Sequence, residues 1–318
     1  MIKLITVVIP TYNRHKLIEK LINDYINRYK GDLFTFEIHD SSPNNLTKKI
    51  IDNYSNPLIS YFKYDSSISA DIKALNAINN VKTEYIYLMG DSVNPNFNKF
   101  EKYLITNNYE KYDVFSFREY ALKKNTDFQC KEYNDMKSFF KDNFWKLTFF
   151  GSYIMKKNIF DKGYKQSEKY IIGKSPFANV SILFEGLIGE KKSCYFAYVD
   201  FITLNPEKKE SGWMTSKQTI EFFCKKYYEC LQLLPTYYCA MNPEELCKQN
   251  TETGLFSKKM ILLFRWNGNL TFKIYNEYKY YIKKTVKNYY FLIFSLFIPK
   301  FFLSFIRFVI KVLRRTNK

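Results

Sequence analysis

The chain has 318 residues, of which 46% are hydrophobic and 25% charged, and this composition predicts a globular protein with a substantial core. The formal net charge is +18, but residues 256–318 hold 14 Lys or Arg and one acid, giving 14 − 1 = +13. The other 255 residues give 35 − 30 = +5. The six cysteines lack CxxC spacing, which argues against a zinc site and favours reduced thiols. Met1-Ile-Lys leads straight into a strand-like run, so we expect no signal peptide.

The first ninety residues alternate between short apolar runs and segments of helical periodicity. The strand-like runs are 4–9, 34–39, 59–64 and 84–89, and the helical segments between them are 15–29, 46–54 and 71–79. This regular order predicts an α/β fold, with a parallel sheet joined by right-handed crossovers and flanked by helices. In the third helical segment, we expect Ile72, Leu75 and Ile78 to form the buried face.

Polar side chains follow these strands at the points where they end. Thr11, Asn13, Asp40, Asp71 and Asp91 all lie at or near predicted carboxyl ends, where open α/β sheets bind ligands. An aspartate just past a buried strand suits a divalent ion, although the residues around it are also ordinary turn residues. The sequence has neither GxGxxG after the first strand nor GxxxxGK[ST]. We therefore expect an ion on Asp91, rather than a glycine-rich loop, to hold the phosphates of a nucleotide.

Three motifs carry a resemblance to a known family. VVIPTYNR at 7–14, EIHDSS at 37–42 and TEYIYLMGDS at 83–92 resemble, in order and spacing, the motifs of family 2 glycosyltransferases of the GT-A fold. The resemblance covers about residues 3–120. It implies a Rossmann-like, mostly parallel sheet, a nucleotide-sugar donor, and a divalent metal cofactor, Mn²⁺ or Mg²⁺.

The resemblance also implies roles for particular residues. The nucleotide pocket would be lined by Pro10, Thr11, Tyr12 and Arg14, with Asp71 at the same edge. Asp40 would bind the uracil or ribose of the donor, and Asp91 would reach the metal and the diphosphate. Two departures stand out, because His39 replaces the first acid of the second motif and Ser92-Val93 replaces the later acids of the third. Asp91 is then the only carboxylate there, which suffices if phosphates and water complete the metal's shell.

The stretch after residue 120 is expected to carry the acceptor site. An inverting transfer needs a carboxylate that takes the proton from the attacking hydroxyl. Glu185 lies at about the expected distance beyond Asp91 and is our candidate for this base, with Asp161, Glu168 and Asp200 as rivals. The alternative is that Glu185 is the polar edge of a buried helix.

Trp213 is a candidate for stacking on a sugar ring or on the donor, and its alternative is simple core packing. We predict a catalytic domain over 1–213, with a nucleotide-binding half of about 1–120 and an acceptor half of about 121–213. A helical closing segment would follow at 214–255. Residues 256–318 would form a basic, amphipathic C-terminal region.

This C-terminal region contains apolar runs at 289–298 and 301–312, interrupted by Pro299-Lys300 and containing Arg307 and Lys311. Each run is too short to span a bilayer by itself. Interleaved aromatic and basic residues favour a helix lying in the membrane interface. The alternatives are a buried oligomerisation helix and a single tilted span with snorkelling basic residues.

These features predict a bacterial, inverting, hexosyltransferase-type enzyme for surface polysaccharide synthesis. The donor would be a nucleotide-diphosphate sugar, most simply a UDP-sugar, and the acceptor a hydroxyl of a glycan or lipid-linked glycan. We expect a cytoplasmic protein, peripheral at the inner face of the cell membrane through 289–318, with homo-oligomerisation open. One alternative is an inactive GT-A scaffold that partners another transferase at the membrane. Nucleic-acid binding is disfavoured, because the excess charge lies within an apolar tail.

Overall fold

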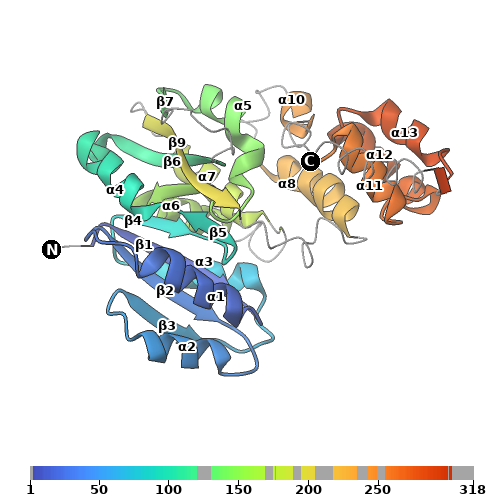
Figure 1. The fold of residues 1–318 in the computed structure, drawn as a ribbon. Helices are drawn as coiled ribbons and strands as arrows, with labels where there is room; N and C mark the ends of the chain where they lie inside the picture. The colour runs from blue at the N-terminus through green and yellow to red at the C-terminus, as the bar shows by residue number, and fades with distance from the viewer. Residues whose placement is uncertain are drawn as a thin grey trace, which may run out of the picture. The chain divides into compact units, whose positions relative to one another are not determined.

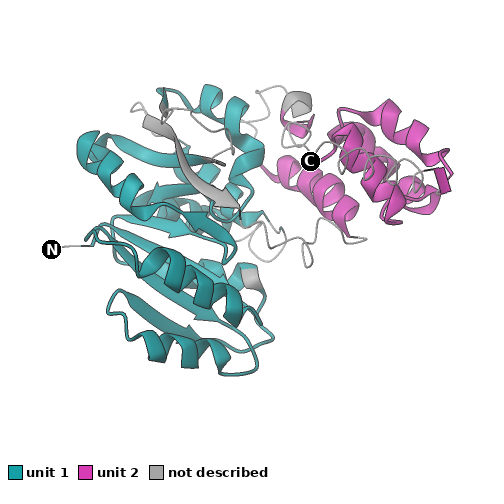
Figure 2. Ribbon diagram, viewed as in Figure 1, with its two compact units in different colours: residues 1–207 teal, residues 208–318 magenta. Residues whose placement is uncertain are grey.

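The computed structural model describes residues 3–119, 130–168, 175, 177–188, 195–204, 218–234, 243–248, 255–299 and 301–302. The chain divides into two compact units, residues 1–207 and 208–318 (Figure 2).

The first unit is built on a sheet whose N-terminal half is parallel. Its strands are β1 (Ile5–Thr11), β2 (Phe34–Asp40), β3 (Ile59–Lys63) and β4 (Tyr85–Leu88), arranged in the order β3-β2-β1-β4 (Figure 1). β1 is buried along its whole length, as expected for an unbroken apolar run at the centre of a sheet. The predicted α/β fold is confirmed, and the four parallel strands coincide with the predicted runs to within a few residues.

Beyond β4 the sheet continues with mixed pairings that the sequence did not predict. β8 (Tyr153–Lys156) lies antiparallel between β4 and β6 (Tyr112–Glu119), and β9 (Tyr195–Leu204) runs parallel to β6. β5 (Val93–Pro95) and β7 (Cys130–Tyr133) both pair antiparallel with β9. Within the described ranges the sheet has nine strands, and it joins the nucleotide-side and acceptor-side halves of the predicted domain into one layer.

Helices flank this sheet. Those of the first unit are α1 (His15–Leu21), α2 (Leu46–Tyr54), α3 (Ala70–Asn80), α4 (Phe97–Thr106), α5 (Met136–Leu147), α6 (Lys157–Ser167) and α7 (Ala178–Leu187). α1 continues as a π-helical turn over Ile22–Ile26 and ends before the predicted Tyr29.

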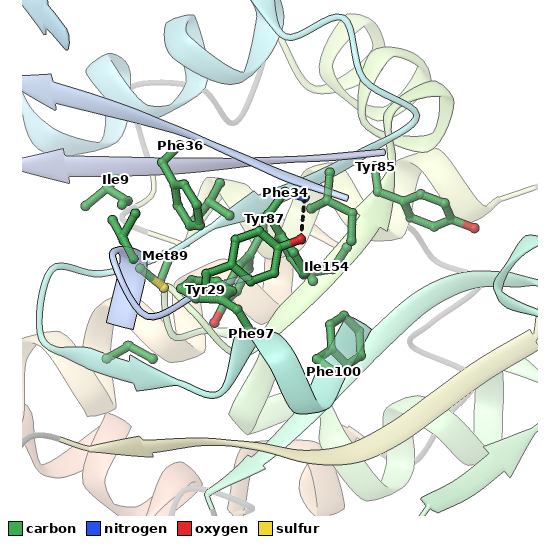
Figure 3. Packing of buried hydrophobic residues seen from close by; sticks show 14 of the residues in the cluster. Ile9, Tyr29, Phe34, Phe36, Tyr85, Tyr87, Met89, Phe97, Phe100 and Ile154 are labelled. Atoms are coloured by element: carbon green, nitrogen blue, oxygen red, sulfur yellow. Dashed lines mark hydrogen bonds between the residues drawn. The ribbon is translucent and has the colours of Figure 1, made fainter. Parts of the chain in front are cut away.

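The alternation of side chains along β4 separates two cores, because successive strand residues point to opposite faces. Tyr87 and Met89 join a cluster with β2 and α4, in which Phe97 packs edge-on against Phe36 with ring centroids 4.9 Å apart (Figure 3). Ile86 and Leu88 face the opposite way and meet Leu75 and Ile78 of α3 around a small cavity. The two cores fix the position of β4 and so of the residues that follow it.

The buried face of α3 differs from the prediction by one residue. Ile72 is 39% exposed, whereas Lys73 is 1% exposed. The buried residues are Lys73, Ala74, Leu75, Ala77 and Ile78, so the expectation for Leu75 and Ile78 was confirmed and the expectation that Ile72 would be buried was wrong. Lys73 takes the inward position because its ammonium donates to polar groups at the ends of β1 and β2.

The second unit is helical in its described parts. Its helices are α8 (Tyr227–Leu233), α10 (Pro243–Lys248), α11 (Lys258–Trp266), α12 (Phe272–Thr285) and α13 (Tyr289–Leu296), with a π-helical turn over Glu221–Lys226 before α8. Ser257 and Thr271 cap α11 and α12, each accepting a backbone N–H with its side chain. α13 packs against α11. None of the helices in the described part of the chain is long and apolar enough to cross a bilayer.

Candidate functional site

Asp91 lies just beyond β4 and is buried. Its Oδ2 accepts a hydrogen bond of 3.1 Å from the Thr11 hydroxyl, and its Oδ1 accepts one of 2.8 Å from Arg14 Nη1. Thr11 ends β1 and Arg14 precedes α1, so two neighbouring parallel strands bring the three side chains to one edge of the sheet. The structure therefore brings Thr11, Arg14 and Asp91 into direct contact.

The turn between β1 and α1 presents the other predicted residues of the first motif. Pro10 is buried in β1 opposite His39, whereas the Tyr12 side chain is exposed. Asn13 adopts a left-handed conformation with φ of 54°, which asparagine tolerates better than most residues. Its backbone N–H donates to Ser42 Oγ at 2.8 Å. The turn after β1 is thereby tied to the loop after β2.

Asp40 ends β2 and is fully buried. One carboxylate oxygen accepts from the Ser42 backbone N–H at 2.8 Å and also from the Ser42 hydroxyl. The other accepts from the Tyr61 hydroxyl at 3.1 Å and lies 3.7 Å from Lys63 Nζ. Burial, and then the Asp40 charge, raise the pKa of Tyr61, so this hydroxyl keeps its proton and remains a donor.

Lys73 of α3 connects these two strand ends. Its Nζ donates at 2.7 Å to the carbonyl oxygen of Thr11 and at 2.7 Å to Ser41 Oγ. Burial lowers the pKa of Lys73 to about 8, and the charges of Asp40 and Asp91 oppose that shift. Lys73 was not among the residues predicted for this site. The available signal was a lysine in the same helical stripe as Ala74, Ala77 and Ile78.

His39 replaces the first acid of the second motif and belongs to a different cluster from Asp40. Its Nε2 lies 3.0 Å from Glu37 Oε2, its Nδ1 lies 3.0 Å from the Tyr64 hydroxyl, and its ring stacks on Phe62 at 4.7 Å. Since neighbouring strand residues point to opposite faces, His39 points away from the Asp40 carboxylate. This substitution therefore leaves the Asp40 contacts intact.

Three further predicted residues lie elsewhere. Asp71 is half-buried in the first turn of α3, two residues before Lys73. Glu185 is buried on α7, where the Gln166 amide of α6 can donate to its Oε2 at 3.1 Å. Trp213 lies outside the described residues. Its predicted stacking role therefore stays a prediction.

The surroundings of Glu185 are those of a helix–helix contact. Gly186, its neighbour, packs so closely on the Ile159 backbone of α6 that a Cβ would not fit. The part of α7 that meets β8 is its first turn, where the Tyr153 hydroxyl donates to the Asn179 carbonyl at 3.0 Å. Six residues of helical rise place Glu185 about 9 Å further along. The close packing of Gly186 on α6 and the Gln166 contact favour the packing role that the sequence left as an alternative to catalysis.

The side chains that could act as metal ligands decide which ion this edge of the sheet could hold. The described residues contain no group of three or more His, Cys, Asp or Glu side chains placed to hold an ion together. Asp91 supplies one carboxylate, and Mg²⁺ and similar ions commonly bind one or two carboxylates together with substrate phosphates and water. The residues thus fit a divalent ion that is completed by a phosphate-bearing substrate.

Known proteins resemble this chain in sequence family and in fold. A family model described as glycosyl transferase family 2 matches residues 6–160, whereas no curated protein matches the sequence. Among solved structures, the chain resembles S. aureus TarS 1–349 in complex with UDP-GlcNAc, with 13% identity over 92% of this chain and 88% of that chain and a TM-score of 0.53. It also resembles TarS 1–349 in complex with UDP, with 14% identity over 90% of this chain and 89% of that chain and a TM-score of 0.52. At such identities the likeness shows a common fold. The chain has the GT-A type of α/β fold, and its residues 6–160 match the model of glycosyl transferase family 2.

Proposed function

We propose that this protein transfers a hexosyl group from a nucleotide-diphosphate sugar, with UDP as the nucleotide, to an acceptor hydroxyl with inversion. The match of residues 6–160 to the family model supports glycosyl transfer. Crystals of TarS, which shares the fold, hold UDP-GlcNAc and UDP, and this supports a uridine nucleotide here. We also propose that the nucleotide binds at the ends of β1, β2 and β4.

The observation that carries the proposal is the contact of Thr11 and Arg14 with Asp91. It places a buried carboxylate and a half-exposed guanidinium side by side at the end of β4. A guanidinium binds phosphate oxygens through paired hydrogen bonds, so Arg14 is suited to a diphosphate. Lys73 adds a second cation behind the same strand ends.

We further propose that Asp91 holds Mn²⁺ or Mg²⁺ when the donor is bound. The ion would neutralise charge on the diphosphate. Arg14 now occupies one Asp91 oxygen, so donor binding is expected to redistribute this ion pair. Asp40, already held by Ser42 and Tyr61, would meet the uracil or ribose.

The acceptor we propose is a glycan or lipid-linked glycan in surface polysaccharide synthesis at the cytoplasmic face of the membrane. The support is the charge of residues 256–318, which is 14 − 1 = +13 and matches an anionic leaflet. Deletion of that region in the native host should then deplete the surface glycan.

The direct test is a panel of nucleotide sugars incubated with the purified full-length chain and Mn²⁺, followed by release of free nucleoside diphosphate. We expect one UDP-sugar to be consumed, and Asp91→Asn to slow its turnover at least about a hundredfold. Asp142→Asn is the matched control, because Asp142 also pairs with a cation, Lys131, at 2.6 Å. A UDP-sugar turned over equally by both variants would contradict the assignment.

A second candidate function is a scaffold without activity. It is favoured by one feature, the occupation of both Asp91 oxygens by the chain's own Thr11 and Arg14. It predicts no turnover of any donor even with glycan acceptors present, no calorimetric binding of UDP, and a stable complex with another transferase.

A further inference from the structure

Residues 290–302 expose a row of large aromatic side chains. Tyr290 is 84% exposed and Phe294 is 62% exposed, and Phe297, Phe301 and Phe302 are exposed as well. Tyr290, Phe294, Phe297 and Phe301 follow one another at intervals of four, three and four residues. We call Tyr290, Phe294, Phe297, Phe301 and Phe302 the aromatic row. Large apolar patches on a protein surface mark sites of interaction, because leaving them in water is unfavourable.

The opposite side of α13 already has its partners. Leu292, Ser295 and Leu296 are buried. Arg265 of α11 donates to the Leu296 carbonyl at 3.3 Å. Within the row, Phe297 also packs edge-on against Phe272 of α12, with ring centroids 5.3 Å apart, and remains 69% exposed. One side of α13 thus belongs to the core of the second unit. The aromatic row is an additional apolar surface, which that core does not need.

The net charge of the sequence segment that contains the aromatic row indicates what kind of surface binds it. Residues 256–318 carry 14 basic residues and one acid, Glu277. Among the basic residues, Lys258 lies 5.7 Å from the Phe291 ring of α13, and Lys259 beside it is exposed. A second copy of this chain would bring an equal positive charge against the first, and like charges repel. An anionic lipid surface instead complements the charge and accepts the aromatic rings.

We infer that the aromatic row docks the protein on the interface of a bilayer that contains anionic lipid. Because the inner side of α13 is packed on α11, only its outer side can meet lipid. The helix would then lie along the surface with its aromatic rings among the headgroups and acyl chains. The exposed basic residues would contact lipid phosphates. This inference concerns the second unit and does not depend on the proposed transfer activity.

The test is sedimentation of the full-length chain with vesicles of phosphatidylcholine, with or without phosphatidylglycerol. We expect binding that requires phosphatidylglycerol and weakens as salt rises. Replacing two rings, Tyr290→Ser with Phe294→Ser, should lower partitioning at least about tenfold, because each ring buries apolar surface in lipid. The control is Ile105→Ser, since Ile105 is an equally exposed apolar residue on α4 of the other unit. The control should bind as the wild type does.

Two outcomes would overturn the inference. One is vesicle binding that the double variant leaves unchanged. The other is absence of vesicle binding by the folded wild type, together with a dimer in analytical ultracentrifugation that the double variant converts to monomer. That result would assign the aromatic row to self-association. Far-ultraviolet circular dichroism checks that each variant remains folded, which is expected because all the replaced side chains are exposed.

Discussion

Asp91 shows how a single side chain joins two segments that are far apart in the sequence. Its two oxygens bind Thr11 and Arg14, residues 80 and 77 positions earlier in the chain. In water an ion pair of this kind contributes little, but here the carboxylate is buried and also accepts from a hydroxyl. The pair therefore orders the turn after β1 before any donor arrives, and a diphosphate would find its cation already positioned.

Lys73 leads to a prediction about pH. Its pKa of about 8 means that it carries a positive charge below that pH and loses it above. Without the positive charge of Lys73, the negative charges of Asp40 and Asp91 would repel the diphosphate more strongly. UDP binding should therefore weaken about three- to tenfold as pH rises through about 8. Lys73→Met should bind UDP weakly throughout and give a flat profile. Calorimetric titrations at several pH values measure this, and a fall that persists in the variant would exclude Lys73 as its cause.

The same shift has a consequence for stability, with a definite sign. The pKa of Lys73 is lower in the folded chain than its ordinary value of 10.5, so the folded state disfavours the charged form. Between about 8 and 10.5 the unfolded chain holds one more proton, and the Lys73 contribution to the free energy of unfolding rises with pH. Below about pH 8 the cost of burying the charged Lys73 side chain is fully present and lowers the free energy of unfolding.

Part of the site could be predicted from patterns in the sequence. Thr11, Asp40 and Asp91 could be predicted because parallel strands end at one edge, and the positions of those strands are visible as apolar runs. Lys73 could not be assigned, because a lysine within a helix is ordinarily solvated and its buried partners, a carbonyl and a hydroxyl, belong to distant segments. Because Lys73 was taken as solvated, the predicted buried face of α3 included Ile72, which is exposed, instead of Lys73.

At the scale of elements, β8 determines the surroundings of Asp91. It enters the sheet antiparallel to β4, after the segment around Gly151, whose N–H donates to the Leu88 carbonyl at 2.7 Å. The antiparallel pairing of this four-residue strand, which sets Met155 opposite Ile86 (155 − 86 = 69 residues earlier), leaves no local signature in the sequence. The parallel half of the sheet could be predicted from regular spacing, whereas the mixed half depends on long-range pairing.

Gly151 gives a prediction at this scale. Its φ is 96°, and a Cβ there would lie 2.8 Å from Val93 Cγ2 in the strand that follows Asp91. Gly151→Ala should lower the free energy of unfolding by about 2 kcal/mol, from backbone strain and this close contact. Gly90→Ala is the control, because a Cβ at Gly90 would make only ordinary contacts, the nearest at 3.6 Å. Urea denaturation compares them, and equal stabilities would contradict the account.

The packing of α6 against α7 leads to a prediction for Glu185. Because Glu185 lies in this helix contact and can accept from Gln166, Glu185→Gln should cost about 1 kcal/mol of stability and leave kcat within about threefold. A general base would behave differently, with kcat falling about a hundredfold or more at nearly unchanged KM and unchanged stability. Steady-state kinetics beside thermal denaturation separates the two roles.

At the scale of the whole molecule, the excess positive charge and the exposed aromatic row both lie in the C-terminal part of the chain, whereas the site lies in the N-terminal part. Residues 1–255 carry 35 − 30 = +5 and include the site, whereas residues 256–318 carry 14 − 1 = +13 and include the aromatic row. The charge difference is readable in the sequence. The aromatic row is not, because the run 289–298 is apolar on all sides and its periodicity does not reveal that Leu292 and Leu296 point inward.

The central claim is that the strand ends around Asp91 bind the nucleotide diphosphate of a sugar donor. The most direct measurement is calorimetric titration of UDP with Mg²⁺ into the wild-type chain, Asp91→Asn and Asp142→Asn. We expect the wild type and Asp142→Asn to bind UDP equally, and Asp91→Asn to bind at least about tenfold more weakly. Equal affinity in all three proteins, or no binding by the folded wild type, would contradict the claim.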